Sequence, residues 1–281
     1  MKHEEVVTDD AEIFGDYSLF PIHSFSRSPP VSRYSIIAVG CEIYVIGGLT
    51  TPSSSVRVLD CLSHTWYDAP SMTVARTRPE SVLLDQKIYV MGGCGRCDNW
   101  FEVFDIETQS WSVLRSRFAD RDELRRGSMV YALQGKLHVV SERSECTYEP
   151  KSGTWEVDSY HGMVDVTVIE NVMYCCSNKE YLMWCDDEDR KWKDIKGLEN
   201  LGQYLISPWD EPRLFNYGGK LVVVWRQTLG QDFVNGESKV WCAKIALERL
   251  RGEIWGEIEW LNTVLRVPEC YFCLNCAVVS I

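Results

Sequence analysis

A repeat of 45 residues is the feature of this sequence that most constrains its fold. The stretch "EIYVIGGLTTPSSSVRVLDCLSHTW" returns as "KIYVMGGCGRCDNWFEVFDIETQSW", so Gly47 and Gly92 lie 45 residues apart, as do Trp66 and Trp111. Two unrelated features with one period indicate an internal repeat. The layout continues in "KLHVVSERSECTYEPKSGTW", in "NVMYCCSNKEYLMWCDDEDRKW" and in a longer copy that begins "GKLVVVWRQTLG". The chain therefore contains five units.

Each unit reads as four short strands, as in "SVLLD", "KIYVMGG", "FEVFD" and "SWSVL". Four strands that recur about every 40–50 residues are typical of a β-propeller, in which each repeat forms one blade around a central channel. A helical solenoid would need an apolar period of about 3.6 residues, and only "ALERLRGE" offers a hint of one. We expect an all-β propeller whose five repeats span approximately residues 35–77, 80–126, 128–160, 163–200 and 213–263.

Glycines and tryptophans mark equivalent positions of the units. A glycine pair at the end of the second strand indicates a place where another backbone approaches closely, and a tryptophan that opens the fourth strand supplies bulk between blades. In the third unit Ser141 and Glu142 replace the glycines. The expected structural marks are Gly47, Gly48, Trp66, Gly92, Gly93, Trp111, Trp155 and Trp192.

Charge and composition disfavour several classes of partner. The chain has 29 basic and 41 acidic residues, a net charge of −12, and no block of Lys and Arg, so nucleic acid and anionic membranes are not expected to bind. The N-terminus lacks the apolar core of a secretory signal, and no apolar run approaches the ~18 residues of a membrane span. We expect a soluble intracellular protein, cytoplasmic and/or nuclear, whose 12 cysteines are mostly free thiols.

The repeat resembles the kelch repeat, because a glycine pair, an aromatic residue and a tryptophan seven residues later occur in that order. The chain resembles plant F-box/kelch-repeat proteins over nearly its whole length. The segments that carry this resemblance are "VGCEIYVIGG", "RVLDCLSHTWYDAPSM", "EDRKWKDIKGLENL" and "VWCAKIALERLRGEIWGEIEW". The resemblance implies a kelch-type β-propeller that acts in the ubiquitination pathway. In that family an F-box docks on the adaptor of a cullin-type ubiquitin ligase, and the propeller captures the target.

The chain departs from the family pattern at its start. Only sixteen residues precede the segment "YSLFPIHSFSRSPPVSRYS", so we expect no F-box in this sequence. We therefore expect a flexible acidic N-terminus over residues 1–16, a propeller over residues 17–281, and no direct docking on the ligase adaptor. The strands "SLFPIHS" and "AVVSI" from the two termini are expected to form a partial sixth blade, with a plain five-bladed ring as the alternative.

Two patterns raise the alternative of a metal-dependent kelch enzyme or a specifier-type cofactor protein. Cys94 and Cys97 have zinc or dithiol spacing, and "CYFCLNC", residues 270–276, offers three more thiols. A structural zinc needs four converging ligands, and a spacing of three along a strand sends successive side chains to opposite faces. Asp60 and His64 have half of an iron-binding spacing, but an aspartate at the end of a third strand usually caps the following turn. We therefore expect no metal, no cofactor and no enzymatic activity.

The remaining candidates for function lie in loops that a propeller presents at one end of its channel. Loops on a rigid scaffold commonly carry recognition, and arginine and tryptophan are frequent interface anchors. We expect a non-enzymatic protein–protein interaction module whose partner is a protein target. The candidate binding residues are Arg76, Arg78, Arg96, Asp98, Asn99, Trp100, Arg125, Arg126, Arg143, Lys179 and Arg226.

Overall fold

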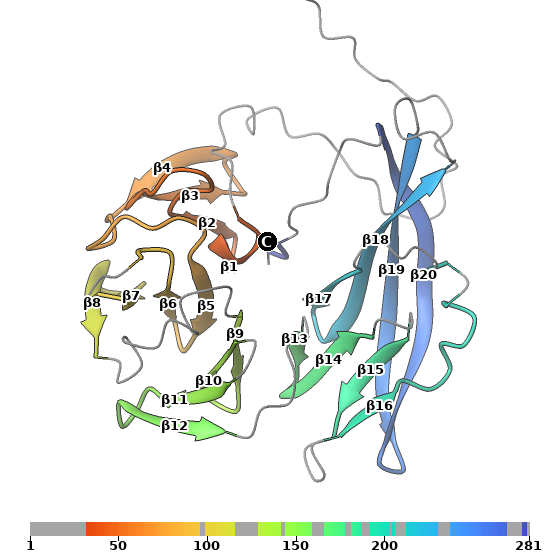
Figure 1. Cartoon of the computed structure of the whole chain (residues 1–281). Helices are drawn as coiled ribbons and strands as arrows, with labels where there is room; N and C mark the ends of the chain where they lie inside the picture. Colours follow the sequence, from red (N-terminus) through yellow and green to blue (C-terminus); the bar gives the residue numbers. More distant parts are fainter. Residues whose placement is uncertain are drawn as a thin grey trace, which may run out of the picture.

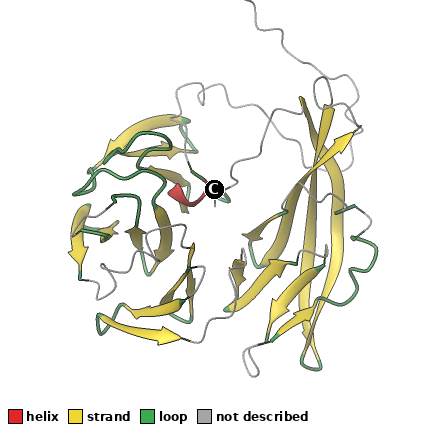
Figure 2. Cartoon of the chain, viewed as in Figure 1, coloured by secondary structure: helices red, strands yellow, loops and turns green. Residues whose placement is uncertain are grey.

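Five four-stranded antiparallel sheets make up the fold (Figure 1; Figure 2). In each sheet the strands follow one another in sequence order, so each sequence repeat builds one sheet. A computed structural model describes residues 32–95, 99–115, 129–141, 144–158, 166–177, 181–186, 191–202, 204–205, 212–229, 237–268 and 277–279.

The first three sheets consist of strands of five residues, apart from the four-residue β1. A short 3-10 helix, η2 (Arg33–Ser35), precedes them. The strands are β1 (Ile36–Val39), β2 (Glu42–Ile46), β3 (Val56–Asp60), β4 (Thr65–Ala69), β5 (Glu80–Leu84), β6 (Lys87–Met91), β7 (Phe101–Asp105), β8 (Ser110–Leu114), β9 (Met129–Leu133), β10 (Lys136–Val140), β11 (Glu145–Glu149) and β12 (Thr154–Asp158).

The last two sheets differ in length. The fourth keeps strands of three to five residues, whereas the three outer strands of the fifth are 10, 14 and 16 residues long. Their strands are β13 (Val166–Ile169), β14 (Val172–Cys176), β15 (Leu182–Cys185), β16 (Trp192–Asp194), β17 (Arg213–Tyr217), β18 (Lys220–Leu229), β19 (Glu237–Leu250) and β20 (Glu253–Pro268).

The first strands of neighbouring sheets contact one another: β1 with β5, β5 with β9, β9 with β13, and β13 with β17. The sheets are thus arranged as the five blades of a propeller around these inner strands (Figure 1). This confirms the all-β kelch-type propeller expected from the sequence. Most of the two terminal segments expected to form a partial sixth blade lie outside the described residues.

The seven-residue spacing of aromatic residue and tryptophan follows from the hairpin between the third and fourth strands. Phe104 lies directly opposite Trp111, and Tyr148 lies opposite Trp155, in the register of these strands. The ring centroids are 5.0 and 4.9 Å apart. Trp155 also contacts Phe101 of the preceding blade at 5.5 Å. Trp111 packs against the buried cluster between blades one and two, so both tryptophans lie between blades, as the sequence predicted.

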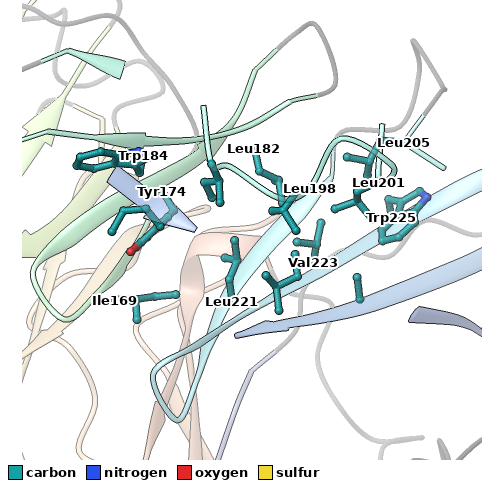
Figure 3. Close-up of a cluster of buried hydrophobic side chains, with 14 residues drawn as sticks. Ile169, Tyr174, Leu182, Trp184, Leu198, Leu201, Leu205, Leu221, Val223 and Trp225 are labelled. Carbon is teal, nitrogen blue, oxygen red and sulfur yellow. The ribbon is translucent and has the colours of Figure 1, made fainter. Parts of the chain in front are cut away.

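Buried apolar clusters fill the spaces between consecutive blades. The largest of them joins the fourth and fifth blades and includes Trp184, Leu201 and Trp225 (Figure 3). Part of this cluster comes from the connector that follows β16, described over residues 195–202 and 204–205, which packs against the long strands of blade five. Among the residues that the structure describes, no helix is long and apolar enough to span a membrane.

Candidate protein-binding face

One end of the propeller carries two kinds of connection, and we name it the crossover end. Because successive strands of a blade run antiparallel, the loop from the second to the third strand and the link to the next blade leave at the same end. The turns between the first and second and between the third and fourth strands lie at the opposite end. The sequence-predicted binding loops therefore belong to the crossover end.

The link from the first to the second blade, residues 70–79, runs between two loops and is hydrogen-bonded to both. Its Arg76 exchanges backbone hydrogen bonds with Ser53, and its carbonyl also accepts from Gly48 N at 3.0 Å. On the other side, Thr77 N donates to Gly93 O at 2.8 Å. The link thus holds together the loops that follow β2 and β6.

Each glycine pair contains a residue that leaves no room for a side chain, Gly93 because of the link and Gly48 because of its own loop. A Cβ on Gly93 would lie 2.5 Å from the carbonyl oxygen of Thr77, which is closer than real Cβ atoms come to any neighbour. At Gly48 a Cβ would lie 1.9 Å from Thr51 O within its own loop. The sequence prediction that the glycines permit close backbone approach is confirmed at both positions.

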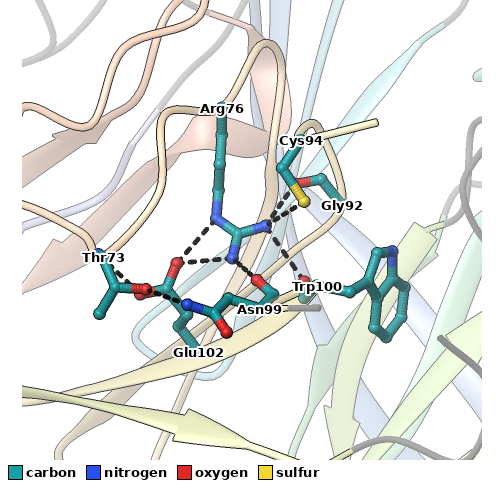
Figure 4. Close-up of polar contacts among 7 residues, drawn as sticks. All are labelled: Thr73, Arg76, Gly92, Cys94, Asn99, Trp100 and Glu102. Atoms are coloured by element: carbon teal, nitrogen blue, oxygen red, sulfur yellow. Dashed lines mark hydrogen bonds and ion pairs between the residues drawn. The ribbon is translucent and has the colours of Figure 1, made fainter. Parts of the chain in front are cut away.

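The side chain of Arg76 ties the same link to the loop of the second blade (Figure 4). Its Nη2 donates to Glu102 Oε1 at 2.6 Å and to Asn99 O at 2.5 Å. Its Nη1 donates to Gly92 O at 2.5 Å and to Trp100 O at 3.1 Å. One guanidinium therefore fixes both ends of the loop between β6 and β7.

Glu102 completes this arrangement with its second oxygen. Thr73 N, at the start of the link, donates to Glu102 Oε2 at 2.8 Å, and Asn99 Nδ2 donates to the Thr73 hydroxyl at 3.1 Å. The Arg76 and Glu102 side chains are both 0% exposed. Burial lowers the pKa of Arg76, while Glu102 opposes that shift, and arginine stays charged in proteins. The pair is a buried salt bridge in which both carboxylate oxygens of Glu102 accept hydrogen bonds, and it joins the link to the loop between β6 and β7.

This burial corrects the expectation for two predicted binding residues. Arg76 is 0% exposed and Trp100 is 1% exposed, so neither side chain is presented to a partner. In Figure 4 the Trp100 indole points away from Arg76; it packs with Phe101 in the core between the second and third blades. The reason is local: the carbonyls of this loop need a donor, and the guanidinium supplies several at once.

The other predicted binding residues have different surroundings. Arg78 is exposed at the crossover end, where its Nε donates to Leu49 O at 3.1 Å, and Asn99 is partly buried. Arg226 lies inside β18, paired with Val240, which corrects its placement in a loop. The remaining six candidates lie outside the described residues: Arg96, Asp98, Arg125, Arg126, Arg143 and Lys179.

Two of the residues considered for metal chemistry, Asp60 and Cys94, make other interactions, while Cys97 and residues 270–276 lie outside the described residues. Asp60 accepts hydrogen bonds from Ser63 Oγ at 2.7 Å and Leu62 N at 2.8 Å, and both bonds lower its pKa. The expected turn-capping role of Asp60 is confirmed. Cys94 is disulfide-bonded, an exception to the expected free thiols, and its Sγ accepts from Arg76 Nη1 at 3.6 Å. Within the described ranges no group of three or more His, Cys, Asp or Glu side chains could hold a metal ion.

Sequence reasoning missed Glu102, the partner on which the Arg76 arrangement depends. A signal was present, because Glu102 interrupts the apolar strand "FEVFD" at a position whose neighbours are buried. A carboxylate in such a strand requires a donor, and an arginine is the usual choice for a buried pair. The pattern indicates the need for a partner but cannot identify Arg76, which lies 26 residues earlier.

The blades, glycine-bounded loops and interblade tryptophans together define a kelch-type β-propeller. The sequence model of the family described as "FKB95, Kelch-repeats domain" matches residues 2–265, and the chain belongs to this family. It is 48% identical to an F-box/kelch-repeat protein of Arabidopsis thaliana over 314 aligned residues, which cover 100% of this chain and 75% of the relative. A second such protein of the same plant is 41% identical, with 94% of this chain and 69% of the relative covered.

Proposed function

We propose that this chain is a protein-binding module that recognises a target protein with the crossover end of its propeller. The observation that carries the proposal is the anchoring at this end, where Arg76 and Glu102 hold both ends of the loop between β6 and β7. Backbone that is already anchored loses less entropy when a partner binds, so exposed groups beside it contribute more to affinity.

Exposed residues lie in the connections at the same end. Arg78 is exposed in the link, and Thr51 and Pro52 are exposed in the loop after β2, while Asn99 is partly buried in the loop between β6 and β7. Such groups offer hydrogen bonds and one positive charge on a rigid base, an arrangement suited to a folded partner surface or a loop. Membership of the kelch-repeat family supports this proposal, because the propeller of F-box/kelch-repeat proteins is expected to recognise the target.

A quantitative affinity pull-down from native cells tests the proposal. The tagged wild type is compared with Arg78→Glu at the crossover end and with Lys151→Glu, an exposed lysine in the turn at the opposite end. We expect a specific partner that Arg78→Glu reduces at least fivefold and that Lys151→Glu retains. Equal loss or equal retention in both variants contradicts the assignment to the crossover end.

The same experiment separates the finer alternatives. Enrichment of the cullin-ligase adaptor together with the target would indicate recruitment to a ubiquitin ligase, and a target without the adaptor would indicate a free-standing binding module. Stoichiometric iron, copper or zinc in the purified protein would instead favour the metal-dependent alternative and contradict a purely binding role.

A further inference from the structure

The turn between β19 and β20 lies at the end of blade five that is opposite the crossover end, and two apolar side chains beside it are exposed. Its two-residue turn is Arg251-Gly252, with both residues in the left-handed region at φ 52° and 83°. Beside the turn, Leu250 and Trp255 are 42% and 46% exposed. Tryptophan is strongly enriched among the residues that dominate binding energy at interfaces.

The strand register places these two side chains on one face of the hairpin together with three carboxylates. Trp255 pairs with Glu248, Leu250 pairs with Glu253, and Glu257 follows two residues after Trp255. Because cross-strand partners and residues two apart share a face, all five side chains lie on the same side of the hairpin. We name this set, Glu248, Leu250, Glu253, Trp255 and Glu257, the hairpin patch.

The opposite face of the hairpin is anchored to the protein core. Ile254 is 3% exposed within the cluster between blades four and five, and Arg249 lies over the Trp184 ring at 5.4 Å. The connector after β16 adds two backbone hydrogen bonds, from Lys196 N to Ile254 O and from Gly256 N to Lys196 O. The backbone that carries the hairpin patch is therefore held in place, so the protein loses little conformational entropy when a partner binds there.

The charge around the apolar pair selects the partner. Three carboxylates belong to the hairpin patch. Two basic residues lie at its margin: Lys196, whose backbone forms a parallel β-bridge with that of Trp255, and Arg251 in the turn. The whole chain carries a net charge of −12, which reinforces the local negative potential. An occupant with apolar side chains flanked by positive charges complements this surface, whereas an acidic occupant is repelled.

We propose that the hairpin patch is a docking site for an extended segment of a partner protein that carries an apolar side chain flanked by Lys or Arg. The proposal rests on the proposed function, a protein-binding module, and adds a second contact surface at a different place on the propeller. The apolar side chain of the segment packs against Trp255 and Leu250, and its basic groups pair with Glu248, Glu253 and Glu257.

Fluorescence anisotropy with an array of labelled hexapeptides tests this site. Each peptide has two central residues chosen from Leu, Ile, Phe and Trp, with two Lys or Arg on either side; a matched array carries Asp or Glu instead. We expect basic peptides to bind, acidic peptides not to bind, and Trp255→Ser to raise Kd at least tenfold. Glu248→Lys with Glu253→Lys should raise Kd at least fivefold and flatten its dependence on salt.

Val113→Ser is the matched control, because Val113 is a 44% exposed apolar residue on β8 of another blade. It should leave Kd unchanged, and the thermal unfolding of every variant should match that of the wild type because none of the substituted side chains is buried in the core. Absence of binding by any basic peptide overturns the proposal, and so does binding that Trp255→Ser and Val113→Ser affect equally.

The two proposals fail in different ways. If no peptide depends on Trp255 while Arg78→Glu still removes the pull-down partner, the hairpin patch is wrong and the crossover end stands. If peptides bind in a Trp255-dependent manner while no variant at the crossover end changes the pull-down, the patch stands and the crossover end is wrong.

Discussion

At Arg76 a buried ion pair takes the place of apolar packing as the means of holding a loop. The guanidinium satisfies carbonyl groups of Gly92, Asn99 and Trp100, and its charge is balanced by Glu102. Removing one partner of such a pair leaves the other charged and buried, and that is far more costly than losing an exposed pair. The two kinds of pair can be compared within this chain.

Glu102→Ala should lower the free energy of unfolding by about 3–5 kcal/mol, because Arg76 then lacks its counter-charge and Thr73 N loses its acceptor. The control is Asp68→Ala, which removes the partner of Arg57 at 3.5 Å where the Asp68 side chain is 82% exposed. We expect a loss below about 1 kcal/mol there. Urea denaturation measures both, and equal losses would contradict the structural role of the buried pair.

Gly93→Ala should be more destabilising than Gly95→Ala, although both glycines have positive φ, 71° and 64°. The left-handed backbone costs roughly 1–2 kcal/mol in either variant. Only at Gly93 does the added Cβ meet a backbone atom, Thr77 O at 2.5 Å, while at Gly95 no atom of the described residues lies within 4 Å. Thermal unfolding should show the larger drop in Tm for Gly93→Ala. Similar drops would mean that the link between blades is free to move away.

At the scale of elements, the connector after β16 acts as a cover for the long strands of blade five. Leu201 is 1% exposed and packs in the same cluster as Trp225, whose Nε1 donates to Tyr204 O at 2.8 Å. At its beginning the connector lies against β20, where a Cβ on Gly197 would come within 2.8 Å of Gly256 O. The connector is thus part of the core of blade five.

Leu201→Ala should therefore lower the free energy of unfolding by about 2–5 kcal/mol, through lost burial and the cavity left beside Trp225. Leu265→Ala on β20 is the matched control, since Leu265 is 48% exposed and its truncation leaves no cavity. Guanidinium denaturation followed by tryptophan fluorescence measures both. A small effect of Leu201→Ala would indicate that the connector can detach without unfolding the blade.

Element scale also shows where prediction from sequence ends. The four strands of each blade and the roles of Gly48, Gly93 and Trp111 follow from the repeat, because each depends on a period visible in the sequence. The burial of Arg76 and Trp100 does not, because it depends on which link meets which loop in space. The packing of the connector after β16 could not be predicted either, because its apolar residues follow no strand period that would identify the strands they contact.

For the whole molecule, the interfaces between blades differ in character. The described cluster between blades three and four contains only Leu133, Met173 and Cys185 as fully buried members. Polar groups share this face of blade three, where His138 Nδ1 lies 3.4 Å from Glu145 Oε1 and both are buried. Among the described residues, the interfaces between blades one and two, two and three, and four and five have larger apolar clusters. Of these four interfaces, the one between blades three and four is therefore expected to be the weakest.

Native-state hydrogen exchange should show this order. Local opening proceeds most easily where few apolar contacts are buried, so amides of β13 and β14 should exchange faster than those of β5 and β6. All four have four or five residues and are the first and second strands of their blades, which makes β5 and β6 a suitable internal reference. Uniform protection across these strands would indicate that the ring opens as one cooperative unit.

The link of residues 70–79 bears on how propellers of this kind can be recombined. In a chimera of two relatives joined after Ala69, one parent supplies Gly48. The other parent supplies Arg76, Gly93 and Glu102, so the buried ion pair stays intact. A junction after Pro79 would instead separate Arg76 from Glu102. Successful grafts should therefore move residues 70–79 with the blade that follows, so the transferable module begins ten residues before its first strand.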